Sequence, residues 1–519
     1  MEYAYRQKDD YDVFWWVRSE EPVTLAADYA GLAAKLDLPE NTSPDQGAII
    51  EAVRSWLEKN EGWLLVFDNA QNFEDLEGYL PRAGSGHVII TSRKQSWGGV
   101  ARMVPVDMFT PAESVEFLRR RTGQEDEDAA KALADALGNP PLALEQAGAY
   151  IEETGISLAS YLNLFQERQK DQKELLGRGK PAAYPDTVAT TWDLSFQKAS
   201  EEVPASADLL NLCAFLAPDD IPKSILAEGL EYLPEPLASA VADEMARNDA
   251  VAALRRYSLL NVADDTLSVH RLVQAVTRDR LKEGGQEKTW AEVAVRLVGG
   301  AFPFDSDDVR TWPECSLLLP HALAAAEHAE ELEVAPEATQ YLLNQAGLYC
   351  EGCAEFGEAK ILYERALPIA ENVYGRDDSE VAAIINNLGL VLQVLGDLEG
   401  ARKSLERAIE IDEKAYGPDH PDVATGVNNL GRVLQAQGDL AGAKKSYERA
   451  LKIDENVYGP NHPNVARDVN NLGGVLQAQG DLAGAKERYE RALEIFRHFL
   501  GEDHPNTKTV QGNLESLQR

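Results

Sequence analysis

The stretch NNLGRVLQAQGDLAGAKKSYERAL, from Asn428 to Leu451, recurs along the carboxyl-terminal third of the chain. Closely similar stretches begin 42 residues before it, at Asn386, and 42 residues after it, at Asn470, and a more divergent copy begins at Asn344. The last ten residues, VQGNLESLQR, resemble the opening of a fifth copy. Self-similarity at a fixed period of this size indicates a solenoid, in which each repeat packs on its neighbours.

Each repeat is expected to form two helices. Leu430, Val433 and Leu434 lie at helical spacing in the first half of the quoted repeat, and Gly438 ends that helix. A second apolar stripe runs from Ala443 to Leu451. Glycine and proline in the connecting segment YGPDHPDVA prevent either helix from continuing, so the two helices and their linker make up one period.

Small and aromatic residues distinguish between two repeat families. A period of 42 residues would also suit HEAT-type helix pairs. Gly431, Ala443, Tyr447 and Ala450, however, stand where a tetratricopeptide repeat has glycine, alanine, a large aromatic residue and alanine. From about Tyr341 onward the array therefore resembles the long tetratricopeptide repeat of kinesin light chains. The resemblance implies a groove that binds a protein or a peptide.

Asparagines recur at one position of the first helix, which in this repeat family faces the concave groove. They are Asn344, Asn386, Asn428 and Asn470. An amide can both donate to and accept from a peptide backbone, so these residues are candidate peptide-binding residues. The alternative, that they join helix to helix, stays open at this point. For the adjacent Asn387, Asn429 and Asn471 the structural interpretation is favoured.

A second informative stretch is GWLLVFDNAQN, from Gly62 to Asn72. Its apolar run ends at Asp68, as a buried strand would. The segments DYDVFWWVRSE before it and GHVIITSRK after it also read as strands, and GAIIEAVRSWLEKN between them shows helical periodicity. Alternating strands and helices predict an α/β unit with a parallel sheet. Ligands of such sheets bind beyond the carboxyl ends of the strands, where Asp68 and Arg93 are expected.

Four motifs, in their order and spacing, resemble the NB-ARC class of STAND nucleotide switches. They are WLLVFDN as a Walker B strand, GSGHVIITSR as a sensor strand, LGNPPLALEQAGAYI as a helix start and LLNVADDTLSVHRLVQAVTRD as the end of a winged helix. The resemblance implies ADP or ATP with Mg²⁺ as ligands. It assigns Asp68 to the magnesium ion, Arg93 to the terminal phosphate, Pro141 to adenine and His270 to the diphosphate of ADP. Taken singly, each residue has an ordinary structural interpretation.

The chain departs from this family at three places. Asn69 stands where efficient hydrolases have a second carboxylate, so rapid hydrolysis is not expected and enzymatic activity is left open. Arg271 replaces the aspartate of the Met-His-Asp motif. No phosphate-binding G-x-x-x-x-G-K-S/T loop precedes Asp68. The sequence thus predicts a P-loop NTPase sheet that lacks its first, central strand, with neighbouring strands left unpaired and nucleotide binding weak or lost. A truncation is favoured over a true loss, and a misplaced start is the third possibility.

The predicted architecture is a multidomain α/β plus α protein. Expected domains are an α/β nucleotide-binding subdomain at 1–105, a helical subdomain at 106–180, a winged helix at 186–284, a helical connector at 285–335 and the repeats at 336–519. The helical subdomain should open at TPAESVEFLRRRTG, with Thr110 as the N-cap and Pro111 at the first helical position.

Composition narrows the possible partners and location. The net charge of −37, from 50 basic and 87 acidic residues, argues against a nucleic-acid surface. No apolar run is long enough to cross a membrane and no signal peptide is evident, so a cytoplasmic location is expected. Four cysteines do not make a disulfide framework, and Cys350 and Cys353 stand at packing positions of the repeat.

These features together predict a STAND-type signalling regulator with an ADP/ATP-dependent switch and a tetratricopeptide sensor for a protein or peptide, able to form homo-oligomers on activation. An interaction scaffold with a vestigial nucleotide module is the alternative. A transcription regulator that binds DNA through the winged helix is disfavoured by the acidic charge.

Overall fold

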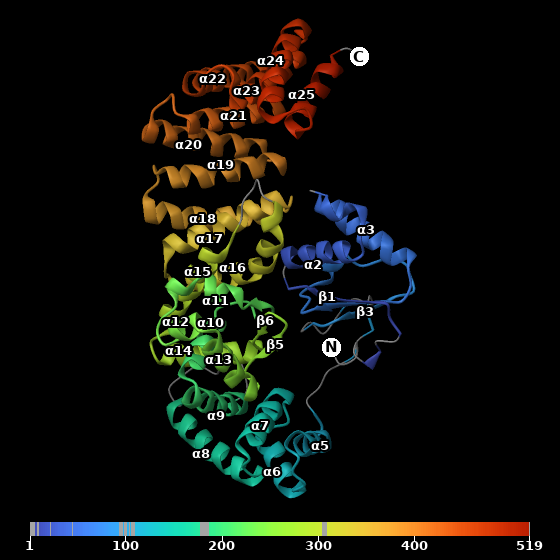
Figure 1. Ribbon diagram of the computed structural model, residues 1–519, viewed down its shortest axis with the longest axis vertical. Helices are drawn as coiled ribbons and strands as arrows, with labels where there is room; N and C mark the ends of the chain where they lie inside the picture. The colour runs from blue at the N-terminus through green and yellow to red at the C-terminus, as the bar shows by residue number, and fades with distance from the viewer. Residues whose placement is uncertain are drawn as a thin grey trace. The chain divides into compact units, whose positions relative to one another are not determined.

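The computed structural model describes residues 6–7, 10–20, 22–43, 45–92, 97, 101–102, 104, 109–176, 186–303 and 309–517. The chain forms two compact units, Met1–Leu342 and Leu343–Arg519, which are described separately (Figure 1). The predicted fold class, a parallel sheet followed by helices and an α-solenoid, is confirmed. The predicted domain boundaries stay a prediction.

The first unit begins with a parallel sheet in the order β1-β2-β3 (Figure 1). The strands are β1 (Val13–Arg18), β2 (Trp63–Asp68) and β3 (His87–Ile90). Between and after them lie α2 (Pro22–Lys35), η1 (Pro39–Thr42), α3 (Gln46–Lys59) and α4 (Phe73–Leu76). Apolar side chains of α2 and α3, such as Tyr29 and Val53, bury the face of the sheet that carries Val17, Leu65 and Phe67. Burial of these aliphatic and aromatic groups stabilises the unit.

β2 is the middle strand of this sheet, and β1 and β3 are its edge strands. β2 pairs with β3 in parallel, from Leu64 opposite His87 to Phe67 opposite Ile90. Pairing satisfies backbone groups that would otherwise form an open sheet edge. Asp68, the last residue of β2, and Thr91, which follows β3, are thereby brought side by side.

A group of helices follows. They are α5 (Pro111–Thr122), α6 (Glu127–Leu137), α7 (Pro141–Thr154) and α8 (Leu158–Leu176). As predicted, Thr110 caps α5 and Pro111 is its first residue. The Thr110 hydroxyl accepts from the Glu113 amide, and the Glu113 carboxylate accepts from the Thr110 amide. This reciprocal arrangement satisfies two backbone donors that the first turn leaves free.

The rest of the first unit combines helices with a small antiparallel sheet. Its helices are α9 (Asp186–Glu202), α10 (Pro204–Cys213), α11 (Ser224–Glu228), η2 (Leu230–Tyr232), α12 (Leu237–Ala242), α13 (Glu244–Arg256), α14 (Arg271–Glu283), α15 (Glu287–Ala301), η3 (Val309–Thr311) and α16 (Trp312–Leu332). The sheet has the order β4-β6-β5, from Ile221–Pro222, Thr266–Ser268 and Asn261–Ala263. A winged helix also contains helices beside a β-hairpin, but the assignment itself stays a prediction.

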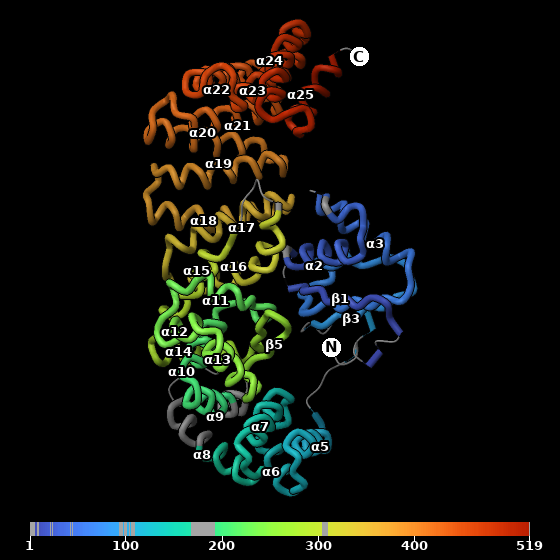
Figure 2. The backbone as a smooth tube through the Cα atoms, viewed as in Figure 1, coloured from blue at the N-terminus to red at the C-terminus, as the bar shows by residue number. Residues whose placement is uncertain are grey.

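The second unit consists of helix pairs with the predicted period, which can be followed from yellow to red in Figure 2. Its helices are the part of α17 (Pro336–Gly352) from Leu343 onward, α18 (Phe356–Tyr374), α19 (Ser379–Val394), α20 (Leu398–Tyr416), α21 (Pro421–Ala436), α22 (Leu440–Tyr458), α23 (Pro463–Ala478), α24 (Leu482–Leu500) and α25 (Pro505–Ser516). A Cβ atom at Gly431 would lie 2.7 Å from the ring of Tyr447. The paired glycine and tyrosine of the repeat therefore let its two helices approach closely.

All four cysteines are free thiols. Cys213, Cys315 and Cys350 are buried, and burial raises the pKa of Cys213 to about 12 and that of Cys353 to about 11. Thiols that stay protonated in this way are poor nucleophiles and poor metal ligands. The packing interpretation of Cys350 and Cys353 is consistent with this burial.

Candidate functional site

A cavity of about 270 Å³ lies at the carboxyl ends of β1 and β2 in the first unit. The segments that follow the two strands, the segment after α10, and helices α14 and α16 contribute its walls. Its charged residues are Arg18, Glu20, Asp68, Asp219, Arg271, Arg278 and Glu327. A ligand-binding cleft is expected at this edge of a parallel sheet. The cavity is thus the candidate functional site.

Asp68 ends β2 and is held by the residue that follows β3. The Thr91 hydroxyl donates to the Asp68 carboxylate and accepts from the Asn69 amide at 2.8 Å. Backbone bonds from Thr91 N–H to the carbonyl of Phe67 and from Ala70 N–H to the carbonyl of Thr91 fix this arrangement. Thr91 lies in the quoted sensor motif, but the sequence did not single it out, because its partner is 23 residues away.

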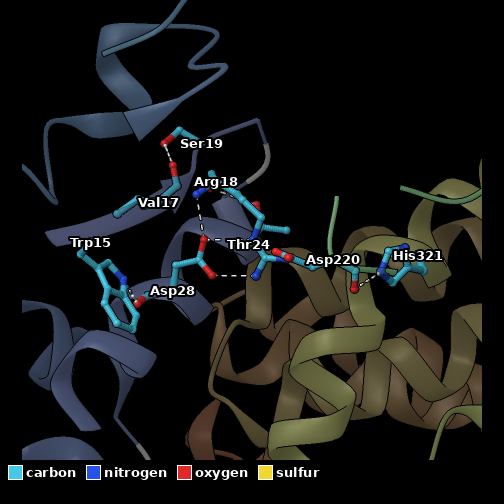
Figure 3. Close-up of polar contacts among 8 residues, drawn as sticks. All are labelled: Trp15, Val17, Arg18, Ser19, Thr24, Asp28, Asp220 and His321. Carbon is cyan, nitrogen blue, oxygen red and sulfur yellow. Dashed lines mark hydrogen bonds and ion pairs between the residues drawn. The ribbon is translucent and has the colours of Figure 1, made fainter. Parts of the chain in front are cut away.

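Arg18 ends β1 and is bound by an aspartate of α2, as Figure 3 shows. Its Nη2 lies 2.6 Å from Asp28 Oδ1, and its Nε and backbone N–H both donate to Oδ2. Its Nη1 lies 4.0 Å from a carboxylate oxygen of Asp220. The Asp220 carbonyl is in turn 3.2 Å from Nε2 of the buried His321 on α16. Polar contacts thereby link β1, the segment before β4 and α16 (Figure 3).

His270 is the N-cap of α14, where its Nδ1 accepts from the Leu272 amide at 3.1 Å. Surrounding protein atoms, and then the Arg271 charge, lower the pKa of His270, so the neutral ring that this cap requires is favoured. His270 is not among the residues that line the cavity. The next residue does line it. Arg271 donates to both carboxylate oxygens of Glu20, each at 2.5 Å.

The structure brings together only part of the predicted nucleotide site. Asp68 lines the cavity, whereas Pro141 is an exposed residue in the first turn of α7 and does not line it. Arg93 lies outside the described residues. The roles predicted for Asp68, Arg93, Pro141 and His270 therefore stay predictions. Arg271, which the sequence singled out only as a departure from the family, lines the cavity that Asp68 lines.

The residues of this cavity fit a magnesium nucleotide only in part. Asp68 could supply one carboxylate ligand to Mg²⁺. Phosphates, however, need free donors, and each of the three arginines already donates to a protein oxygen: Arg18 to Asp28, Arg271 to Glu20, and Arg278 to the carbonyl of Ala214. Of these guanidinium groups, Arg18 keeps one buried nitrogen, Nη1, without a hydrogen-bond partner among the described residues. Four acidic side chains also line the cavity. As it stands, the described pocket does not fit the phosphates of a nucleotide.

The asparagines of the second unit form a ladder between repeats. Asn429 Nδ2 donates to Asn386 Oδ1 at 3.1 Å, and Asn471 Nδ2 donates to Asn428 Oδ1 at 3.0 Å. Asn513 on α25 continues the ladder by donating to Asn470. The oxygens of Asn386, Asn428 and Asn470 are thus used inside the array. Peptide binding by their remaining N–H groups stays a prediction.

Asn344 stands apart from the ladder. Its Oδ1 atom is buried, and the described residues provide no hydrogen-bond partner for it. The structural role favoured for Asn429 and Asn471 agrees with the ladder.

Sequence families match two regions of the chain. The tetratricopeptide repeat family matches residues 380–456, 425–497 and 468–519, and a domain of unknown function, DUF7779, matches residues 194–286. The second unit is a tetratricopeptide-repeat array. Arrays of this kind present extended concave surfaces for partners, so a protein-interaction surface is indicated.

A nucleotide-binding leucine-rich repeat (NLR)-like protein of Hyaloscypha variabilis is 25% identical to the chain over 413 residues. The match covers 72% of this chain and 40% of that protein, so the chain spans less than half of its relative's length. This relative, together with the repeats, confirms the resemblance to NB-ARC/STAND-type proteins that carry tetratricopeptide repeats.

Two solved structures are distantly similar to the chain. BtubC (BKLC) of P. vanneervenii is 20% identical, with 60% of this chain and 94% of that chain covered and a TM-score of 0.33. A Signal Transduction ATPase with Numerous Domains (STAND) protein with a tetratricopeptide repeat sensor, from Pyrococcus horikoshii, is 14% identical, with 99% and 81% covered and a TM-score of 0.38. Likenesses of this degree identify neither a function nor a ligand.

In the described part of the chain, no helix is long and apolar enough to span a membrane. Within the same residues, no group of three or more histidine, cysteine, aspartate or glutamate side chains is placed to hold a metal ion.

Proposed function

We propose that this chain is a STAND-type signalling regulator in which the tetratricopeptide array binds a protein or peptide and the first unit changes conformation with ADP or ATP. One observation carries the proposal: a single cavity is lined both by Asp68, at the end of a parallel strand, and by Arg271, from the domain at residues 194–286. A ligand held there would touch both parts and could shift the equilibrium between their arrangements.

We further propose that nucleotide binding is weak in this chain. Two features of the cavity support this: each of its arginines already donates to a protein oxygen, and four acidic side chains line it. The uncharged Asn69 beside Asp68 supports slow hydrolysis, so the chain would act by holding nucleotide rather than by consuming it. Its site of action would be the cytoplasm, and assembly into homo-oligomers would follow activation.

Titration calorimetry of the full chain with ADP or ATP in the presence of Mg²⁺ tests the switch. We expect binding in the millimolar range, weakened further by Asp68→Ala. Asp75→Ala is the matched control, because Asp75 is an exposed acid on the neighbouring α4 that does not line the cavity. Absence of heat at millimolar nucleotide would leave the interaction scaffold as the function of this chain. Micromolar binding would contradict the weak-binding part of the proposal.

Selection from a random peptide library displayed on phage tests the array. The expected result is enrichment of peptides whose binding is weakened by Asn386→Ala or Asn470→Ala but not by Lys445→Ala, an exposed residue of a second helix. If the enriched peptides bind both asparagine variants as tightly as the native chain, these two residues are not part of the binding site. The DNA-binding alternative gains no support from a chain with a net charge of −37.

A further inference from the structure

Two contacts between charged side chains join the sheet to the domain at residues 194–286. Arg271, the first residue of α14, holds both carboxylate oxygens of Glu20, which follows β1, at 2.5 Å. Close by, Arg18 at the end of β1 faces Asp220 across 4.0 Å (Figure 3). A bidentate pair of arginine and carboxylate is the strongest ion-pair geometry that side chains offer.

Among the described residues, the hydrophobic core around the sheet does not extend into this junction. All members of the core around the sheet lie between residues 13 and 97, so the described part of that core is closed within the α/β region itself. α16 packs against α2, but beside it lies the polar cavity of about 270 Å³. A contact of this kind can open without exposing a hydrophobic core.

The helices at 111–176 are attached to the same domain in a different way. The rings of Tyr150 and Tyr257 are both buried, with centroids 5.9 Å apart. The hydroxyl of Ser258 donates to Glu145 at 3.0 Å, and Arg256 pairs with Glu153 at 3.2 Å. Apolar burial thus holds this second junction, which makes the charged junction at the sheet the weaker of the two.

The positive charge of Arg271 interacts with more than one carboxylate. Besides Glu20, the charges of Asp219 and Asp68 act on its guanidinium. Glu20 and Asp68 belong to the α/β region, whereas Asp219 belongs to the segment after α10. Removal of Arg271 would therefore leave like charges facing one another across the junction, and attraction would become repulsion.

We propose that Arg271 is an electrostatic latch that closes the first unit without a nucleotide, with the carboxylate of Glu20 taking the place that an anionic ligand group would occupy. The inference deepens the proposed function, because opening of this latch would be the motion of the switch. An incoming phosphate group must displace Glu20 from Arg271, which couples anion binding to opening.

Hydrogen exchange of the full chain without nucleotide, read by mass spectrometry in α2 and at 216–222, tests the latch through a double-mutant cycle. Arg271 and Glu20 are 42% and 39% exposed, so we expect Arg271→Gln to speed exchange there about two- to fivefold. Glu20→Gln should speed exchange in the native background but slow it in the Arg271→Gln background, where it relieves repulsion. High salt should remove these differences.

Arg256→Gln is the matched control, because Arg256 is also 42% exposed and its carboxylate partners lie outside the α/β region. Equal effects of Arg256→Gln and Arg271→Gln in α2, or simple additivity of the two latch substitutions, would overturn the latch. Should Arg271→Gln fail to fold, Glu20→Gln alone still decides: unchanged exchange counts against the latch.

The cycle is run without nucleotide, so its outcome is independent of calorimetry. A positive cycle with no nucleotide binding would keep the latch and remove the nucleotide switch. Nucleotide binding together with a negative cycle would keep the nucleotide switch and remove the latch.

Discussion

The repeat array and the junction at the sheet are held together by different kinds of contact. In the array, a glycine packs on a tyrosine of the same repeat at Gly347, Gly431 and Gly473, and asparagine pairs join successive repeats. At the junction, single charged residues such as Glu20 and Arg271 meet once. Repetition produces a stiff scaffold whose contacts reinforce one another, whereas the junction depends on few groups and on the ionic conditions.

The largest expected effect comes from the repeated aromatic residue. Tyr447→Ala removes a ring that is 1% exposed and packs on Gly431, and should lower the free energy of unfolding of the array by about 3–5 kcal/mol. Urea unfolding, monitored through hydrogen exchange in α21 and α22, measures this loss of stability. The control is Tyr458→Ala, whose ring is 41% exposed. Equal losses for both tyrosines would mean that the repeated contact is not what stabilises the array.

A pair of buried carboxyl groups in the array allows the two regions to be compared by how their stability depends on pH. Asp468 and Asp454 are 0% and 1% exposed, and burial, offset in part by Arg467 and reinforced by Asp454, raises the pKa of Asp468 to about 8. Because the folded pKa lies above the unfolded one, this group's stabilisation is complete below about pH 4 and is lost as pH rises through about 8. Asp468→Asn should therefore be more stable than the native array at pH 9, by about 3 kcal/mol.

Thermal unfolding of the two proteins at pH 5 and pH 9 checks this prediction. Asp503→Asn, at a fully exposed acid, is the control. A stability difference between native and Asp468→Asn protein that does not change with pH would rule out the raised pKa of Asp468.

The first unit should show the opposite pH dependence. His321 is fully buried, and this burial, followed by the Arg18 charge, lowers its pKa to about 4, although its contact with the Asp220 carbonyl acts against the shift. A lowered histidine pKa contributes stability above the unfolded pKa that is lost as pH falls through the folded one. Between pH 7 and pH 4.5 the native first unit should lose about 2 kcal/mol that His321→Gln does not lose.

Hydrogen exchange in α16 at the two pH values, corrected for intrinsic rates, measures this loss. His87→Gln replaces an exposed histidine and serves as the control. If native and His321→Gln proteins lose protection equally on acidification, the buried ring is not responsible.

The asparagine ladder carries the smallest predicted effect. Asn471→Ala leaves the Asn428 oxygen without its donor and should lower the free energy of unfolding of the array by about 1 kcal/mol. Chemical denaturation compares it with Asn513→Ala, which removes the last rung, on α25. A variant with unchanged stability but weaker peptide binding would favour the groove role over the structural one.

How much of the structure the sequence predicted depends on how far apart along the chain the contacting residues lie. Helix pairs, caps and the parallel strands followed from local patterns, since apolar spacing and capping residues act within one element. Gly431 and Tyr447 were singled out as repeat positions, but the contact between them was not predicted. Direct pairing of β2 with β3 was missed, because strand order depends on which backbone edges are free to pair in the folded sheet.

The limit of prediction from sequence is clearer at the candidate functional site. Asp68 was recognised from its strand, but its bond from Thr91 and the pairing of Arg271 with Glu20 were not. Glu20 and Arg271 are 251 residues apart, and no periodicity connects them. Local residue order was enough to specify the helices, the strands and the repeat. Which charges face one another in the cavity depends on how these elements pack, because an ion pair forms only where folding brings two distant groups within a few ångströms.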